Sequence, residues 1–377
     1  MVEESAGSRR ANSSPRAGHS LAEVARYVLG ILIGIAVLLV LFGKRGDLAA
    51  SWHQLGRASL GWVAAAAGAE ALSLWLYAYL QHRVLRLAGT AIAMPALYLL
   101  TLANDAIAGT VPGEPAVSSA YRYRFYRRHG ASGAGAGWTV FTILIAQAIG
   151  MSLLLLTGVL VALAASTSRV SAGVTVLGLV IVLGAGAVLV RRDLVLRLAG
   201  GLVRGFQRVT GHPRGGIGAR VESTLTRMRE IPLSARSTVA VVGIATAVWF
   251  SDFFCLVFSF RAVHAQVPWH GVLLAYGAAQ VVGSFPVVPG GLGIVEGSLA
   301  VILAAYGAGQ VAALSAAITF RIVNFWLAIA VGWLAVGLIA TRARRAPGPM
   351  ASKPADSGPA DCGPGGDPGP VAGSGAG

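Results

Sequence analysis

The amino-acid sequence predicts an all-α polytopic membrane protein with six full spans and two re-entrant helical hairpins in an inverted-topology repeat. Only 12% of the 377 residues are charged, about half of the roughly 25% found in globular proteins. Hydrophobic residues make up 55% of the chain, and the mean hydropathy is +0.69. A soluble protein of this size needs far more polar surface to cover its core. These values exclude an ordinary soluble enzyme, a disordered regulator and a disulfide scaffold.

The basic residues of the chain indicate membrane orientation rather than nucleic-acid binding. The formal net charge is +15, from 30 basic and 15 acidic residues. Such an excess in a soluble protein suggests a nucleic-acid partner. Here the basic residues lie between apolar runs, so the positive-inside rule and attraction to anionic lipid headgroups explain them, and we expect no nucleic-acid partner. The two cysteines, Cys255 and Cys362, lie far apart, and we expect neither a disulfide nor a thiolate metal site.

Six apolar runs reach the length of about 20 residues that a helix needs to cross the hydrocarbon core. They cover residues 24–43, 59–81, 138–163, 170–190, 236–258 and 315–340. No clear cleavage site follows the first run, so we favour a span over a signal peptide there. Residues 1–23 are polar, and residues 346–377 consist mostly of Pro, Gly, Ala, Ser and Asp. Both ends are expected to be disordered and cytoplasmic, because neither can bury a core.

Two further apolar regions are interrupted, and the arginines around them predict that they do not cross the membrane. Residues 191–236 contain ten arginines and three acids, so the segment 191–235 is expected to be cytoplasmic. With the N-terminus also inside, the region between Arg86 and Arg122 starts and ends on the cytoplasmic side. A single crossing cannot do this, whereas a re-entrant hairpin that turns at Pro112-Gly113 can.

The second half of the chain follows the same logic. Residues 270–310 are expected to enter from outside and return, turning within Pro286–Gly293. Three full crossings through 270–340 would also give the odd number of crossings that is needed to end on the cytoplasmic side. Each half then has three crossings, so the halves 24–163 and 170–341 have opposite orientations. Secondary transporters commonly build a midplane site from two such halves and their discontinuous helices.

The glycine-rich turn of the second half is the first candidate site. Pro289-Gly290-Gly291-Leu292-Gly293 cannot continue a regular helix, and it precedes a predicted helix start near Ile294. Free N–H groups at a helix N-terminus suit a phosphate or a carboxylate. The alternative is a plain turn that lets two helices cross closely. The same two interpretations apply to Pro112–Pro115.

Charged residues inside apolar runs are the second kind of candidate, because such charges usually face a cavity or a partner. We expect Glu296 and Arg321 to pair, or Arg321 to hold an anionic headgroup that Glu296 orients; the alternative is a purely structural salt bridge. Asn324 is expected on the same helix face as Arg321, three residues away. Glu70 and Asp252 could relay protons or coordinate a cation, or they could simply hydrogen-bond a neighbouring helix.

These interpretations define the candidate residues. For substrate binding they are Pro289, Gly290, Gly291, Gly293, Glu296, Arg321, Asn324, Pro112, Gly113 and Arg122; for coupling they are Glu70 and Asp252. Arg122 could attract lipid phosphates at the cytoplasmic mouth of the first hairpin, or it could only signal topology. The sequence shows no metal-ligand spacing, no nucleophile–base set and no phosphate-binding loop, so we expect no metal, no cofactor and no catalytic residue.

Two motifs resemble the lysylphosphatidylglycerol synthase transmembrane, or flippase-like, domain family over roughly residues 24–341. The more specific motif is Val288–Gly297, followed by Phe320–Trp326 and Gly332-Trp333. The looser motif is Val111-Pro112-Gly113, with Tyr121-Arg122 and Arg127–Ser132. The chain departs from many relatives in Phe141–Gly150, where an acidic-plus-arginine motif is replaced by an uncharged stretch.

The resemblance implies a domain that moves a lipid, such as an aminoacylated or glycosylated phospholipid, between the leaflets of the bacterial cytoplasmic membrane. Full-length synthases carry an aminoacyl transferase domain after the membrane part, and here residues 346–377 follow instead, so the synthase activity is not expected. The alternative function is a non-transporting membrane partner that presents lipids to a glycosyltransferase or another lipid-modifying enzyme. We therefore expect membrane lipids, and in the second case a transferase, as partners.

Overall fold

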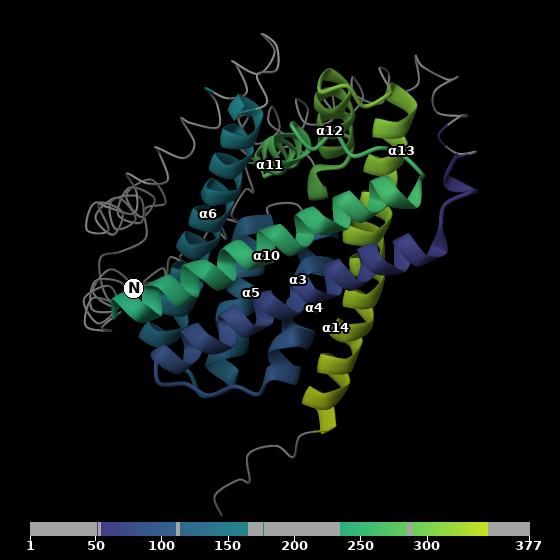
Figure 1. Ribbon diagram of the computed structural model, residues 1–377. Coiled ribbons are helices and arrows are strands. Elements are labelled where there is room, and N and C mark those ends of the chain that lie inside the picture. The colour runs from purple at the N-terminus through teal and green to yellow at the C-terminus, as the bar shows by residue number, and fades with distance from the viewer. Residues whose placement is uncertain are drawn as a thin grey trace, which may run out of the picture.

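A computed structural model describes residues 51, 54–110, 114–164, 176, 234–284 and 289–345, and this part of the chain consists of helices and the turns that join them (Figure 1). Four helices in it are long and apolar enough to cross a membrane: Leu60–Leu87, Gly133–Ala164, Ala235–Ala262 and Gln310–Ile339. They match four of the predicted spans. The other predicted spans, apart from residue 176, lie outside the described residues, as do both ends and most of the basic segment: 1–23, 24–43, 170–190, 191–233 and 346–377.

The described helices form two series with the same order. The first comprises α3 (Leu60–Leu87), α4 (Met94–Thr110), α5 (Glu114–Arg128) and α6 (Gly133–Ala164). The second comprises α10 (Ala235–Ala262), α11 (Val272–Gly283), the short turn η1 (Pro289–Gly291), α12 (Ile294–Ala305), α13 (Gln310–Arg321), η2 (Ile322–Leu327) and α14 (Ala328–Arg345). The helix starts at 60, 94, 114 and 133 recur at 235, 272, 294 and 310, which is 175 to 180 residues later. This constant interval is the pattern expected of an internal repeat.

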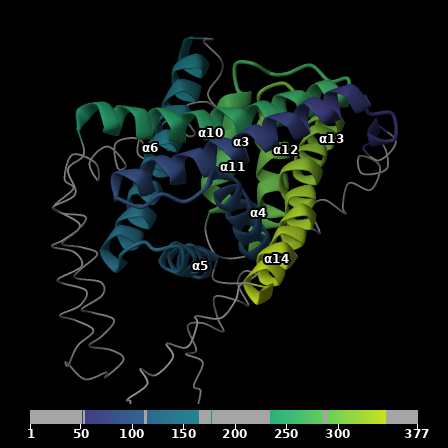
Figure 2. The same ribbon diagram turned by 90° about the horizontal axis from the view of Figure 1, so that it is seen from below.

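Helices α3 and α10 lie side by side and run in opposite directions (Figures 1 and 2). The backbone N–H of Ser59, just before α3, donates to the carbonyl of Ala262 at the end of α10, over 2.9 Å. Near the middle of both helices, the Ser73 hydroxyl donates to the Val248 carbonyl over 3.1 Å. Ser73 and Val248 are 175 residues apart, as are the two helix starts, so equivalent positions meet where the helices cross. These two helices thus run in opposite directions at the crossing, as an inverted repeat requires.

Close helix crossings fix the long helices onto this antiparallel pair. A Cβ atom added at Gly150 of α6 would lie 2.9 Å from the backbone of Ala245 in α10. A Cβ atom at Gly332 of α14 would lie 2.3 Å from the carbonyl oxygen of Leu102 in α4. Small residues at helix crossings allow the backbones to approach in this way. Helix α14 consequently lies along α4 (Figures 1 and 2).

The predicted interruption of the second half is confirmed. Helices α11 and α12 have 12 residues each, and the backbone between them turns through Gly290 and Gly293, whose φ angles are 63° and 80°. The end of α4 meets this turn, because the Gly109 carbonyl oxygen lies 3.3 Å from the position of a Cβ atom at Gly290. Helices α4, α11 and α12 are each shorter than the roughly 20 residues of a full crossing. That they form re-entrant hairpins stays a prediction.

Candidate functional site

Buried polar side chains gather where the α11–α12 turn meets the α3–α10 crossing and the junction of α13 with η2. They form two adjoining groups. The arginine cluster consists of Arg321, Glu296 and the backbone of Gly290. The carboxyl pair consists of Glu70 of α3 and Asp252 of α10. Asn324 donates to both carboxyl groups, and Tyr276 and Gln280 donate to Asp252.

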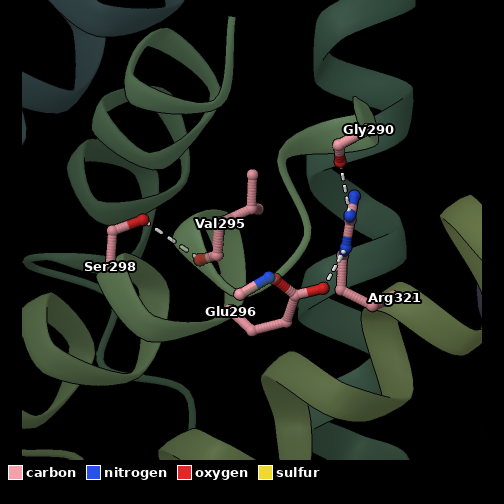
Figure 3. A network of polar contacts seen from close by, with 6 residues as sticks. Gly290, Val295, Glu296, Ser298 and Arg321 are labelled. Carbon is pink, nitrogen blue, oxygen red and sulfur yellow. Dashed lines mark hydrogen bonds and ion pairs between the residues drawn. The ribbon is translucent and has the colours of Figure 1, made fainter. Parts of the chain in front are cut away.

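The arginine cluster ties α13 to the turn before α12 (Figure 3). The Nε atom of Arg321 donates to Oε1 of Glu296 over 2.7 Å, and Nη2 donates to the carbonyl oxygen of Gly290 over 2.7 Å. The exposed fractions of the Arg321 and Glu296 side chains are 7% and 15%. Charge-assisted hydrogen bonds of this length in a buried setting are among the stronger polar contacts in proteins. The predicted pairing of Glu296 with Arg321 is therefore present.

The other carboxylate oxygen of Glu296 caps α12. Oε2 accepts a hydrogen bond of 2.7 Å from the backbone N–H of Gly293, the residue that precedes the helix. A carboxylate three residues into a helix that reaches back to the preceding N–H forms half of a capping box, and its charge favours the positive end of the helix dipole. The anion position predicted at this helix start is thus occupied by a carboxylate of the chain itself.

An aromatic ring completes the arginine cluster. The guanidinium carbon of Arg321 lies 4.2 Å from the ring centroid of Phe325, at a distance typical of a cation–π contact. A Cβ atom at Gly290 would lie 2.4 Å from the same ring, and one at Gly109 would lie 3.1 Å from it. Phe325 therefore occupies the space that the glycines leave open, between the end of α4 and the turn before α12. Sequence reasoning did not single out this residue.

A π-helical turn separates Arg321 from Asn324. The segment Ile322–Leu327 is a π-helix, and Arg321 is the residue that precedes it. Because a π-turn is wider than an α-turn, residues three apart no longer lie one above the other. Arg321 points to the arginine cluster, whereas Asn324 points to the carboxyl pair. The two side chains, expected on one face of the helix, therefore contact different but adjoining groups.

Asn324 connects the two halves of the chain at the carboxyl pair. Its Nδ2 atom donates to Oε2 of Glu70 over 3.1 Å and to Oδ1 of Asp252 over 2.7 Å. Glu70 and Asp252 also lie within hydrogen-bonding range of each other, and their exposed fractions are 7% and 6%. The structure thus brings the two candidate coupling residues into one buried contact.

Helix α11 supplies two polar residues that sequence reasoning missed. The Tyr276 hydroxyl and Nε2 of Gln280 both donate to Oδ2 of Asp252, the latter over 3.2 Å. The two residues are four positions apart, so they share one face of the helix. A tyrosine and a glutamine at this spacing in an apolar run of 12 residues were the signal that could have found them.

The remaining candidates are distributed differently. Arg122 of α5 donates to the hydroxyl of Tyr77 in α3 and lies 5.7 Å from the centroid of that ring, and this contact lies outside both groups. Pro112 and Gly113 lie outside the described residues. Gly291 has a φ angle of 62° and, with Pro289, forms the turn η1. Within the described ranges, no group of three or more His, Cys, Asp or Glu side chains could hold a metal ion.

Comparison with known proteins identifies a family for the chain. A comparison with curated proteins finds no match for the chain. The model of one protein family, the lysylphosphatidylglycerol synthase TM region, matches residues 27–332. The matched residues include the first three apolar spans, the fourth span up to residue 332, and both polar groups. The chain therefore belongs to the lysylphosphatidylglycerol synthase TM region family and is a membrane protein related to lipid handling.

Proposed function

We propose that this protein moves an anionic, aminoacylated or glycosylated lipid between the leaflets of the bacterial cytoplasmic membrane, with both chain ends cytoplasmic. The family and the apolar helices support a lipid-handling membrane protein. The observation that carries the finer proposal is Arg321, a buried arginine in an apolar helix whose partners come from an interrupted helix pair. Such intramembrane charges are costly and mark substrate pathways more often than ordinary packing.

Arg321 would bind the lipid by exchange. Its guanidinium is engaged by Glu296 and by the Gly290 carbonyl, so an incoming phosphate has to replace the carboxylate. Phosphate and carboxylate both match the planar donors of arginine. Once displaced, Glu296 no longer holds both Arg321 and the Gly293 N–H, and the start of α12 is released. Binding would thereby be linked to movement of the proposed hairpin.

The proposal involves no covalent chemistry and no cofactor. The two interrupted regions, which meet at Gly109 and Gly290, would form the re-entrant hairpins that guide the headgroup. Inverted repeats allow such a site to face either side of the membrane in turn. The protein would then act as a carrier with its termini on one side.

Reconstitution of the full chain in liposomes tests the proposal. Fluorescent phosphatidylglycerol is placed in both leaflets, and an impermeant reductant reports how quickly the inner pool becomes accessible. Wild-type protein should accelerate the exchange, and Arg321→Met should abolish most of the acceleration. Arg261→Met, which removes an exposed arginine at the end of α10, is the matched control and should retain it.

Two other outcomes would replace the proposal. If the wild-type protein binds the lipid but never speeds its exchange, the chain presents lipids to a partner enzyme instead. If Arg321→Met and Glu296→Gln lower the melting temperature while exchange remains at the wild-type rate, the ion pair is structural only. Each outcome is read from the same liposomes together with a melting curve.

A further inference from the structure

The carboxyl pair lies where α3 of the first series crosses α10 of the second. Glu70 belongs to the first series of helices and Asp252 to the second, and both are more than nine-tenths buried. The proposed exchange at Arg321 uses neither of them. Their contact is therefore a second feature of the site, separate from lipid recognition.

Among the described residues, few positive charges act on the pair. The titratable or charged groups that act on it are Asp105 and Tyr98 of α4, Cys255 of α10, Tyr276 of α11 and Arg321 of α13. Arg321 is the one cation among these groups, and it is already paired with Glu296. Two carboxylates side by side in a buried site cannot both stay ionised without such compensation. The charge balance thus requires a proton in the contact.

The hydrogen-bond partners indicate where this proton resides. Asp252 accepts from three donors, namely Tyr276, Gln280 and Asn324, which suits an ionised carboxylate. Within the described part of the chain, Glu70 accepts one hydrogen bond, from Asn324, and it lies next to Asp252. A protonated Glu70 that donates to Asp252 satisfies both groups.

We propose that Glu70 and Asp252 share a single proton, carried by Glu70, and that this proton keeps the π-helical turn η2 closed on the pair. Loss of the proton from Glu70 to water leaves two adjacent carboxylates, which repel each other. Asn324 then cannot hold both, because the carboxylates move apart. The shared proton therefore keeps Glu70 of the first half in contact with Asp252 of the second half.

The carboxyl pair is connected to the arginine cluster through one turn of the backbone. Asn324 follows Arg321 by three residues, and Phe325, the next residue, carries the ring beneath the guanidinium. A shift of Asn324 therefore moves the groups that hold Arg321 against Gly290. This step rests on the proposed lipid function. Protonation of the carboxyl pair controls when a lipid headgroup can replace Glu296 as the partner of Arg321.

Infrared spectroscopy of the purified full chain tests the shared proton without any transport measurement. The carbonyl stretch of a protonated carboxyl group is separate from that of a carboxylate. Wild-type protein at neutral pH should show this band for a buried group, and the band should disappear as the pH is raised. Glu70→Gln should remove the band, because the proton resides on Glu70 and the remaining Asp252 carboxylate keeps its three donors. Asp105→Asn, the neighbouring acid on α4, should leave the band in place.

A wild-type spectrum without the band at neutral pH overturns the proposal even if no variant folds. A band that persists in Glu70→Gln or vanishes in Asp105→Asn also overturns it. In liposomes, lipid exchange by the wild type should depend on pH, and the double variant Glu70→Gln/Asp252→Asn should lose that dependence. If the double variant keeps the dependence, the shared proton does not control lipid exchange. The band in a wild type that exchanges no lipid supports the shared proton and refutes the proposed function.

Discussion

Replacement of Arg321 by methionine should destabilise the protein more than any other change in the arginine cluster. The substitution removes two hydrogen bonds of 2.7 Å and leaves the Glu296 side chain, which is 15% exposed, with the Gly293 N–H as its remaining donor. Breaking a buried ion pair in this way typically costs about 3–5 kcal/mol. Glu296→Gln should cost less, about 1.5–3 kcal/mol, because its amide oxygen can still accept from Arg321.

The double variant Glu296→Gln/Arg321→Met decides whether this reasoning holds. Once the lone carboxylate has been neutralised, no buried charge is left without a partner, so the double variant should be more stable than Arg321→Met alone. Thermal and denaturant unfolding in detergent micelles provides the comparison, with Arg261→Met as the control for losing an exposed arginine. If the two single effects simply add in the double variant, the two side chains do not act as an ion pair.

Three further substitutions test the close packing around the site, each by melting temperature in micelles. Gly332→Ala should destabilise by about 1–3 kcal/mol because its Cβ would lie 2.3 Å from a carbonyl of α4, whereas Gly337→Ala on the same helix meets open space and should be neutral or stabilising. Gly290→Ala should cost more than Gly89→Ala: both have positive φ, but only Gly290 also faces an aromatic ring at 2.4 Å. Asn324→Leu should cost about 1–3 kcal/mol by leaving the carboxyl pair without its shared donor; an unchanged melting temperature would contradict it.

Local patterns in the sequence predicted the features that depend on local chemistry. The glycine-rich run before Ile294 predicted the break between α11 and α12, because consecutive glycines with a proline cannot continue a helix. The isolated charges Glu296 and Arg321 predicted their own contact, since neither has another compensating charge nearby in the chain. Hydropathy likewise predicted four spans whose helices the structure describes.

The remaining features depend on geometry that adjacent residues do not encode. The π-turn at Ile322–Leu327 adds a fraction of a residue per turn, and helix propensities do not distinguish it from an α-turn. That turn sends Asn324 to Glu70, which is 254 residues away along the chain. The hydrogen bonds from α11 to Asp252 depend in the same way on how distant helices pack.

The antiparallel crossing of α3 and α10 has a consequence for biogenesis. The Ser251 hydroxyl of α10 donates to the Ala69 carbonyl of α3, and the two residues are separated by 182 positions in the chain. At ribosomal rates of about 5–20 residues per second, α3 therefore waits roughly 10–40 seconds before α10 has been made. Throughout this interval Glu70 lacks the partners that later surround it. The first half of the chain is consequently an incomplete folding unit, and its exposure to membrane quality control ends only when the second half arrives.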